Sequence, residues 1–183
     1  FKPMLAGNDV RFYSVKWNGE HWISYGSWLG AARNNKFFTS KRIIVKQIID
    51  WTTKRIWAAL TDEELYNTQN AFVLIAKKGF IPEYLIALIN SKLISYYHTK
   101  TFTDEFKLRF QKILIKDAKK FPIRNIKEIE QKPFKSFVNQ ILAAKKESPK
   151  ADTSSFENEI DKLVYQLYNL TPEEIQTIES SIK

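Results

Sequence analysis

Alternating apolar and polar positions predict β-structure in the first part of the chain. Residues 10–17 and 22–25 are rich in aromatic and β-branched side chains, and Asn18-Gly19 stands between them. Asn-Gly is a strong hairpin signal because both turn residues must take positive φ, so we expect a β-hairpin over residues 10–25. The alternation is lost in the polar and basic stretch of residues 27–39, which predicts a long loop.

Three further strands and then a helix are predicted in the middle of the chain. The strands fall at residues 41–49, 55–60 and 71–77, where apolar and β-branched residues dominate. Residues 81–97 change to helical spacing, with apolar side chains near one face. The basic stretch that follows is harder to assign, and residues 110–115 are expected to form one more strand.

The last third of the chain is predicted to be helical. A helix should begin near Pro133, and a polar linker follows over residues 145–154. A second apolar stripe covers residues 156–167. Because short amphipathic helices cannot bury such stripes alone, we expect them to pack on the main body or on another domain.

The start of the final helix is marked with particular clarity. Thr171 is suited to the N-cap, Pro172 to the first helical position and Glu174 to the third position of a capping box. Leu170 and Ile175 are spaced as a hydrophobic staple.

These elements together predict an α+β fold, a curved and mostly antiparallel sheet with flanking helices and a C-terminal helical segment. We expect a body over residues 1–125 and a helical extension over residues 126–183, with the linker near residues 145–154.

Composition narrows the class of protein. At 183 residues and 44% hydrophobic, the chain can bury a core, and no apolar run approaches the roughly 18 residues that span a bilayer. It contains no cysteine and only two histidines, His21 and His98, which leaves no Cys/His zinc cluster and no disulfide framework. We expect a cytoplasmic protein and, since the chain opens at Phe1, a piece of a longer polypeptide.

Charge is unevenly distributed along the chain. Residues 1–150 hold 27 Lys and Arg against 13 Asp and Glu, a balance of +14, whereas residues 151–183 hold 2 against 7, a balance of −5. Such a split indicates a polyanion-binding body with an acidic tail segment. A generically lysine-rich surface is the alternative, because net charge bears on association and not on fold.

No catalytic motif is found in the chain. An amino-methyltransferase of DNA needs an Asn/Asp-Pro-Pro-aromatic loop, yet none of the six prolines adjoins another. Neither a P-loop nor a G-x-G-x-x-G pattern is present. The run Asp104-Glu105-Phe106-Lys107 is similar to half of a metal-dependent nuclease site, but a match this short arises easily by chance. Whether the chain is an enzyme is therefore left open, with no catalytic and no metal-binding residue predicted.

Basic and amide side chains on predicted loops and strand ends are the better candidates. Phosphate contacts need Lys, Arg and hydroxyl groups, and base edges are read by arginine on guanine and by Asn or Gln on adenine. Lysines on the strand would position DNA, while forked or amide donors in the loops would read it. The predicted DNA-binding residues are Arg33, Asn34, Asn35, Lys36, Lys41, Arg42, Lys46, Lys54, Arg55, Asn67, Thr68, Gln69, Asn70, Lys100, Thr101, Lys107 and Arg109.

Two alternatives stand beside that reading. Each of these side chains, taken singly, can equally belong to a solvated charged surface, and the whole basic surface could dock an acidic protein partner instead of DNA. Most aromatic residues fall at core positions, whereas Trp28 and Trp51 lie on predicted loops and could stack on bases.

The order of several segments resembles the TaqI-like C-terminal specificity domain, the target-recognition part of restriction-modification DNA methyltransferases. The segments are RIIVKQI (42–48), RIWAAL (55–60), YLIALINSKLISYY (84–97), KKFPI (119–123) and IDKLVYQLYNLTPEEI (160–175). Together they extend over nearly the whole chain, and their order is more specific than any one of them.

The resemblance implies a bacterial type II enzyme that methylates adenine N6 in double-stranded DNA. An N-terminal methyltransferase domain of the same polypeptide would bind S-adenosylmethionine, and a fused nuclease, where present, would need Mg²⁺. This chain itself would hold no cofactor and would select the target sequence. Contact residues differ among members of the family because their targets differ, so none is transferred by position.

Overall fold

Short strands alternate with turns and loops in the first half of the protein. The computed structural model describes residues 1–103 and 111–183. Its strands are β1 (Lys2–Leu5), β2 (Val10–Arg11), β3 (Ser14–Val15), β4 (Trp22–Ile23), β5 (Arg42–Lys46), β6 (Ala58–Thr61), β7 (Tyr66–Asn67) and β8 (Ala71–Leu74). A 3-10 turn, η1 (Gly7–Asp9), and the short helix α1 (Lys36–Thr39) lie between them.

The central sheet has the order β6-β5-β8 and is antiparallel throughout. Side chains alternate across a strand, so β5 serves two cores. Ile43 and Val45 point into the larger core beneath α2 (Pro82–Asn90), whereas Ile44 points into a smaller one with Leu5 and Val10. Burial on both faces explains the unbroken apolar run of β5.

Two smaller sheets flank the central one. Strand β1 pairs with β4 antiparallel and with β7 parallel, and β2 pairs with β3. The α+β class and the mostly antiparallel pairing are confirmed, but the strands form three small sheets.

The hairpin predicted over residues 10–25 is wrong in its pairing. Gly19 has a φ of 83°, and the rings of Trp17 and Trp22 meet edge to face across the turn, so the chain does reverse there. However, β4 forms its antiparallel backbone hydrogen bonds with β1, not with residues 10–17. The chain turns at Asn18-Gly19, but of these two residues only Gly19 has a positive φ, and a strand from elsewhere in the chain supplied the partner.

The helix predicted over residues 81–97 is two helices, α2 and α3 (Lys92–Phe102). Ser91 breaks the ladder with extended backbone angles and caps α3 by accepting a hydrogen bond from the amide of Ile94. The Asn90 side chain bonds to both backbone groups of Ala58, at 2.8 and 3.0 Å, which ties α2 to β6.

The segment after α3 also differs from its prediction. Residue 110 of the strand predicted over residues 110–115 lies outside the described residues. In place of a strand in the rest of that range, residues 111–113 run beside the end of β5 with a single bridge between Ile48 and Lys112. The turn-like helix α4 (Ile115–Ala118) follows.

Three helices complete the chain, α5 (Glu128–Glu147), α6 (Ser154–Leu167) and α7 (Pro172–Ser181). Helix α5 begins five residues before the predicted Pro133, which lies inside the helix and lacks the N–H that would donate to the carbonyl of Ile129. In α7 the predicted capping box is present, with Thr171 and Glu174 exchanging hydrogen bonds of 2.8 and 3.3 Å.

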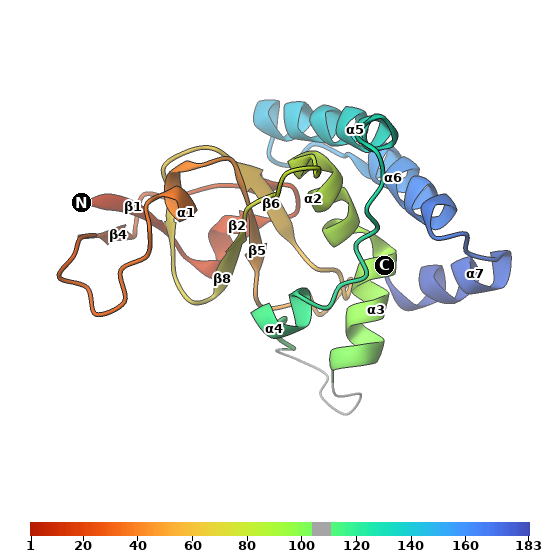
Figure 1. The fold of residues 1–183 in the computed structure, drawn as a ribbon, viewed down its shortest axis with the longest axis horizontal. Coiled ribbons are helices and arrows are strands. Elements are labelled where there is room, and N and C mark those ends of the chain that lie inside the picture. Colours follow the sequence, from red (N-terminus) through yellow and green to blue (C-terminus); the bar gives the residue numbers. More distant parts are fainter. Residues whose placement is uncertain (104–110) are drawn as a thin grey trace.

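The helical extension packs on the body, as its apolar stripes require. Helix α5 packs on α2, and α6 packs on α5 and α3, on the side of the molecule away from the strands (Figure 1). Val138 and Val164 belong to the same core as Ile86 of α2. The division into residues 1–125 and 126–183 stays a prediction, because the two parts share this core.

Candidate functional site

Two of the predicted DNA-binding loops meet at one hollow on the surface. The hollow encloses about 470 Å³. One wall is the segment between β4 and α1, and the other is the turn between β7 and β8. Its lining residues are Tyr25, Ala31, Arg33, Phe37, Phe38, Gln47, Asn67, Thr68, Gln69, Ala71, Phe72, Val73 and Ile115.

The long loop of residues 27–35 is tied down at its base by Tyr25. The Tyr25 hydroxyl donates to the carbonyl of Arg33 at 2.9 Å and accepts from the amide of the same residue. The Tyr25 ring packs on Phe38 and Tyr66, whose own rings stack at 4.3 Å. An aromatic cluster therefore fixes the backbone of Arg33 while its side chain stays exposed.

Side chains further along this loop have mixed roles. Asn34 accepts a hydrogen bond from the amide of Lys36, and the Lys36 ammonium lies 5.4 Å from the ring centre of Phe37. Asn35 is exposed at the start of α1, where its carbonyl accepts from Phe38.

The turn of residues 67–70 is shaped by its own side chains. Asn67 donates to the carbonyls of Thr68 and Ala71, so its amide group builds the turn. The Asn70 amide lies 3.3 Å from the Thr68 hydroxyl, and the Asn70 carbonyl accepts from Gln47 at 2.8 Å. The Gln69 and Asn70 side chains are left exposed at the hollow and its rim.

Arg42 and Arg55 are corrections to the predicted set, because both are buried and bonded within the protein. Arg42 is 1% exposed and donates to three backbone carbonyls, those of Ser40, Glu63 and Leu65. It closes the loop between β6 and β7 and presents no donor to a ligand.

Arg55 ties the helical extension to the body. Its guanidinium donates to the carbonyl of Asn90 at 2.7 Å and lies 3.7 Å from Glu157 and 3.6 Å from Asp161. Its flat face covers the ring of Phe12. We assign Arg42 and Arg55 structural roles.

The strand lysines are only partly available to a ligand. Lys41 forms an ion pair with the buried carboxylate of Glu83 at 2.6 Å. Lys46 lies over the ring of Trp57 at 4.9 Å, and burial lowers its pKa. DNA contact by either lysine stays a prediction.

The remaining predicted residues lie away from the hollow. Lys54 is exposed beside the C-terminus, where the Lys183 amide donates to the carbonyl of Thr53. Lys100 and Thr101 are exposed at the end of α3. Lys107 and Arg109 lie outside the described residues.

The exposed loop tryptophans are likewise outside the lining of the hollow. Trp28 and Trp51 are exposed, as their loop positions predicted. Base stacking by either stays a prediction.

Sequence reasoning missed several residues of the hollow. Tyr25 was placed in a hairpin strand, Gln47 in the middle of a strand, and Ile115 at the end of another. Gln47 reaches the hollow because β5 ends at Lys46. Ile115 does so because residues 111–113 run beside β5, with the Ile113 amide donating to the Gln47 carbonyl at 2.8 Å. The only sequence signal for the part of the hollow lined by Ile115 is the series of lysines in residues 112–120.

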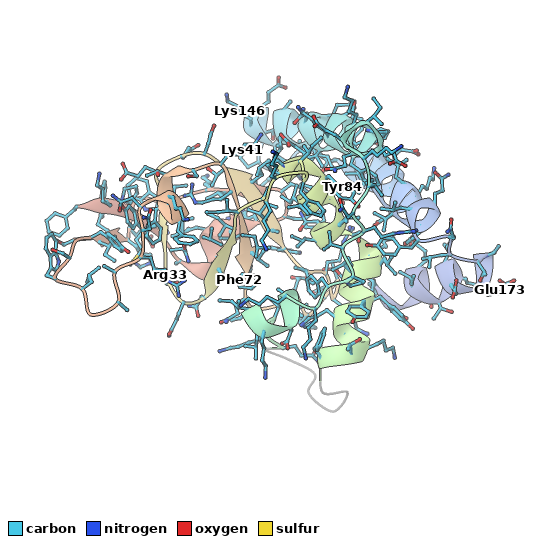
Figure 2. The ribbon with its side chains drawn as sticks, in the orientation of Figure 1. Arg33, Lys41, Phe72, Tyr84, Lys146 and Glu173 are labelled. Atoms are coloured by element: carbon cyan, nitrogen blue, oxygen red, sulfur yellow. The ribbon has the colours of Figure 1, made fainter. Side chains whose placement is uncertain are left out.

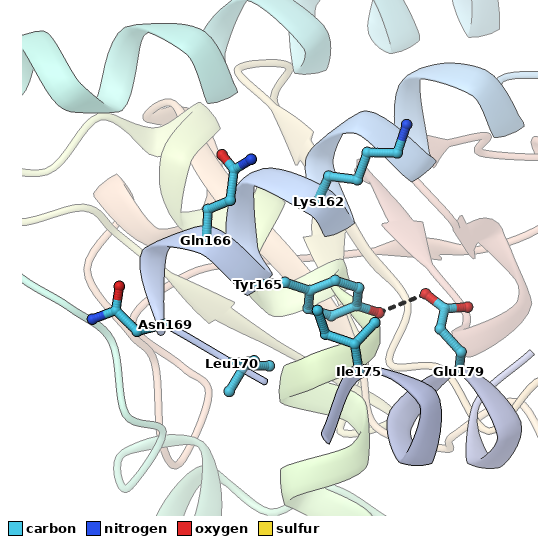
Figure 3. A pocket seen from close by; sticks show the side chains of 7 residues that line it. All are labelled: Lys162, Tyr165, Gln166, Asn169, Leu170, Ile175 and Glu179. Atoms are coloured by element: carbon cyan, nitrogen blue, oxygen red, sulfur yellow. Dashed lines mark hydrogen bonds between the residues drawn. The ribbon is translucent and has the colours of Figure 1, made fainter. Parts of the chain in front are cut away.

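A second hollow of about 650 Å³ lies between α6 and α7, and Figure 3 shows its lining. Tyr165 crosses it and donates to Glu179 at 2.7 Å, and Leu170 and Ile175 lie at its apolar side. None of the predicted DNA-binding residues lines it. The acidic balance of this part of the chain makes it a poor site for a polyanion.

Within the described residues, no three His, Asp or Glu side chains come together as a metal site. No helix of that part of the chain is long and apolar enough to cross a membrane. His98 lies buried inside α3, and desolvation lowers its pKa against the opposing charge of Asp117.

This chain was compared with protein families, curated proteins and solved structures. The family model described as the TaqI-like C-terminal specificity domain matches residues 2–123. No curated protein matches. Among solved structures, the fold is similar to part of MmeI, a type IIL restriction-modification enzyme solved in complex with DNA, with a TM-score of 0.57 and 12% identity. The match covers 72% of this chain and 19% of that one, so this chain corresponds to about a fifth of its length.

Proposed function

This chain belongs to the TaqI-like C-terminal specificity domain family, and on that premise we propose that it recognises a target sequence in double-stranded DNA for a restriction-modification enzyme. The observation that carries the proposal is the meeting of two predicted recognition loops at one hollow. Arg33 and Gln69 lie on opposite walls of that hollow with exposed side chains.

The chemistry at the hollow suits base edges. Arginine pairs with guanine through two donors, and a glutamine amide pairs with adenine through one donor and one acceptor. The body that carries these groups has a balance of +14, which favours phosphate binding along the surrounding surface. The MmeI structure supports the proposal to the extent that it was solved with DNA.

The rest of the enzyme is inferred from the family. We propose a bacterial, cytoplasmic type II adenine-N6 methyltransferase, in which an N-terminal domain of the same polypeptide binds S-adenosylmethionine and performs catalysis. Mg²⁺ would be needed only where a nuclease is fused. The purified chain should then show no saturable binding of S-adenosylmethionine in isothermal titration.

Duplex binding as a function of salt tests the proposal. If about six phosphates are neutralised, the logarithm of the association constant should fall with the logarithm of salt concentration at a slope near −5. The measurement is fluorescence anisotropy of a labelled duplex titrated with the chain. A slope near zero, or no binding at low salt, would instead favour a domain that docks an acidic protein.

The assignment of reading residues needs the parent enzyme. Arg33→Ala and Gln69→Ala should each relax discrimination at one base pair, worth about 1–3 kcal/mol, without abolishing methylation. Methylation rates on single-base variants of the recognition site measure this. Parallel loss on every variant would mean that the loops serve as a nonspecific clamp.

A further inference from the structure

The segment of residues 112–120 borders the hollow but belongs to none of the predicted loops. It enters beside β5, where the Ile49 amide donates to the Gln111 carbonyl and the Ile113 amide donates to the Gln47 carbonyl, at 3.0 and 2.8 Å. These bonds hold the segment against the sheet that carries the hollow. Figure 1 shows α4 below β8, on the opposite side of the molecule from α5.

In this segment the basic side chains are exposed and the acidic side chain is buried. The segment has four exposed lysines, of which Lys120 lies 5.8 Å from the ring centre of Phe102. For the other three, Lys112, Lys116 and Lys119, no ion pair is found within the described part of the chain. Asp117, the one acidic residue of the segment, is buried and faces His98. The exposed charges of residues 112–120 are therefore all positive.

Two branched apolar side chains stand among these lysines. Leu114 is 37% exposed and Ile115 is 45% exposed. Ile115 also lines the hollow that contains Arg33 and Gln69, so the apolar pair is continuous with the proposed recognition site. The backbone under the pair is ordered by hydrogen bonds of 3.0 Å from the amides of Asp117 and Ala118 to the Leu114 carbonyl.

We propose that residues 112–120 form a second DNA-contacting element beside the hollow. The three lysines neutralise phosphates, while Leu114 and Ile115 lie in a groove against apolar base edges. The inference rests on the proposed function, because its partner is the same duplex.

Charge complementarity selects duplex DNA over an apolar protein surface as the partner. An apolar pair that docked on another protein domain would bring three unpaired lysines into that interface, which costs free energy unless each lysine meets an acid. A DNA duplex offers the two kinds of contact together, since phosphates flank a groove that displays the thymine C5-methyl group.

The lysines are tested through the salt dependence of duplex binding by the 183-residue chain. A K112Q/K116Q/K119Q variant should make the slope of log K against log salt shallower by about 2.7, since each phosphate contributes about 0.9. The matched control is K132Q/K135Q/K146Q on α5, which removes the same charge from exposed positions. Figure 2 shows Lys146 on the side of the molecule away from α4.

The apolar pair is tested through the thymine methyl group. A Leu114→Ala/Ile115→Ala variant should lose roughly tenfold in affinity at every salt concentration, with an unchanged slope. The wild-type chain should prefer an alternating A·T duplex over the same duplex containing uracil, and the variant should lose this preference. Ile129→Ala, at a residue that is 62% exposed at the start of α5, is the control and should change neither quantity.

The outcomes separate this inference from the proposed function. If the wild-type chain binds duplex DNA but the lysine variant keeps the wild-type slope, or the apolar variant keeps the thymine preference, the second element is refuted and the recognition function stands. If the wild-type chain binds no duplex, both fail together. Urea midpoints of all variants establish that losses are not caused by unfolding, and Ile115→Met, which keeps an apolar side chain, should bind like wild type.

Discussion

At the scale of single residues, burial decides what an arginine does in this protein. Arg33 and Arg42 are nine positions apart, and both are among the predicted DNA-binding residues. Arg33 has an exposed side chain at the hollow, whereas Arg42 is enclosed by three carbonyls that it satisfies. The first is available to a ligand, and the second is required by the fold.

Replacing the buried arginine should therefore destabilise the protein. Arg42→Met fills a similar volume but leaves three backbone carbonyls without their donors, so we expect a loss of at least about 3 kcal/mol in the free energy of unfolding. Urea denaturation measures it. Arg33→Met is the matched control and should change stability by less than about 0.5 kcal/mol. Equal effects at the two positions would contradict the assigned roles.

The Tyr25 hydroxyl is the residue-scale feature on which the Arg33 loop depends. Tyr25→Phe keeps the ring in its aromatic cluster and removes both hydrogen bonds to Arg33. The loop should then open more often, so trypsin should cleave after Arg33 several times faster. As the loop becomes less ordered, the parent enzyme should also discriminate less well between single-base variants of its recognition site.

The matched control for that prediction lies in the same cluster. Tyr66→Phe removes a hydroxyl whose hydrogen bond within the described residues goes to Glu64, at 3.4 Å, and should leave both quantities unchanged. Faster cleavage in Tyr25→Phe with undiminished discrimination would show that order in this loop is not used for recognition.

At the scale of elements, a buried cluster of polar groups attaches α6 to the body. Asp161 accepts a hydrogen bond from the Lys92 amide at 2.9 Å and lies 3.6 Å from Arg55. Burial nevertheless outweighs these partners and raises the pKa of Asp161 to about 6. Glu179 adds a like charge, while Arg55 and Lys92 oppose the shift.

The raised pKa predicts how stability depends on pH. The folded state holds the Asp161 proton more tightly than the unfolded state, whose pKa is near 3.8. The stabilisation by the protonated Asp161 is therefore complete below pH 4 and is lost as the pH rises through 6. The free energy of unfolding should fall by about 3 kcal/mol over this range. Free energies of unfolding from urea curves at pH 4 to 7 measure it.

The comparison that isolates Asp161 uses two variants. Asp161→Asn should be free of this decline, so wild type should lose stability relative to it between pH 4 and 6.5. Glu157→Gln, which alters the other carboxylate beside Arg55, should retain the decline. Parallel wild-type and Asp161→Asn curves would mean that the carboxylate is ionised throughout this range.

At the scale of the whole molecule, the acidic end of the chain near Glu173 lies far from the hollow, although Glu157 and Asp161 lie beside Arg55 of the body. Figure 2 places Arg33 and Glu173 toward opposite ends of the long axis. Charges further apart than the Debye length, about 8 Å at physiological salt, are largely screened. The acidic extension should therefore not weaken DNA binding at the hollow.

Single charge changes at the two ends test this separation. Lys36→Gln, near the hollow, should weaken duplex binding severalfold at 150 mM salt. Glu173→Gln changes the net charge by the same amount in the opposite sense and should alter affinity by less than about twofold. Anisotropy titrations give both values. A gain in Glu173→Gln as large as the loss in Lys36→Gln would mean that net charge governs binding.

Local signals in the sequence were sufficient for much of the fold. The α+β class, the strands around Ile43, Ala59 and Phe72, and the capping box of α7 follow from periodicity, propensity and capping chemistry within a few residues. The two candidate loops could be predicted in the same way, because amide and basic residues between apolar runs favour exposed turns.

Only the tertiary structure decided which chain segments meet. β4 pairs with β1 in place of its sequence neighbour, Arg42 and Arg55 face inward, and residues 111–115 come to lie beside Gln47. Each outcome depends on partners that are distant in the sequence, such as Leu65 for Arg42 and Asp161 for Arg55. Charge, spacing and turn chemistry are properties of neighbouring residues, whereas burial and pairing are set by competition among distant segments for the same core and the same backbone donors.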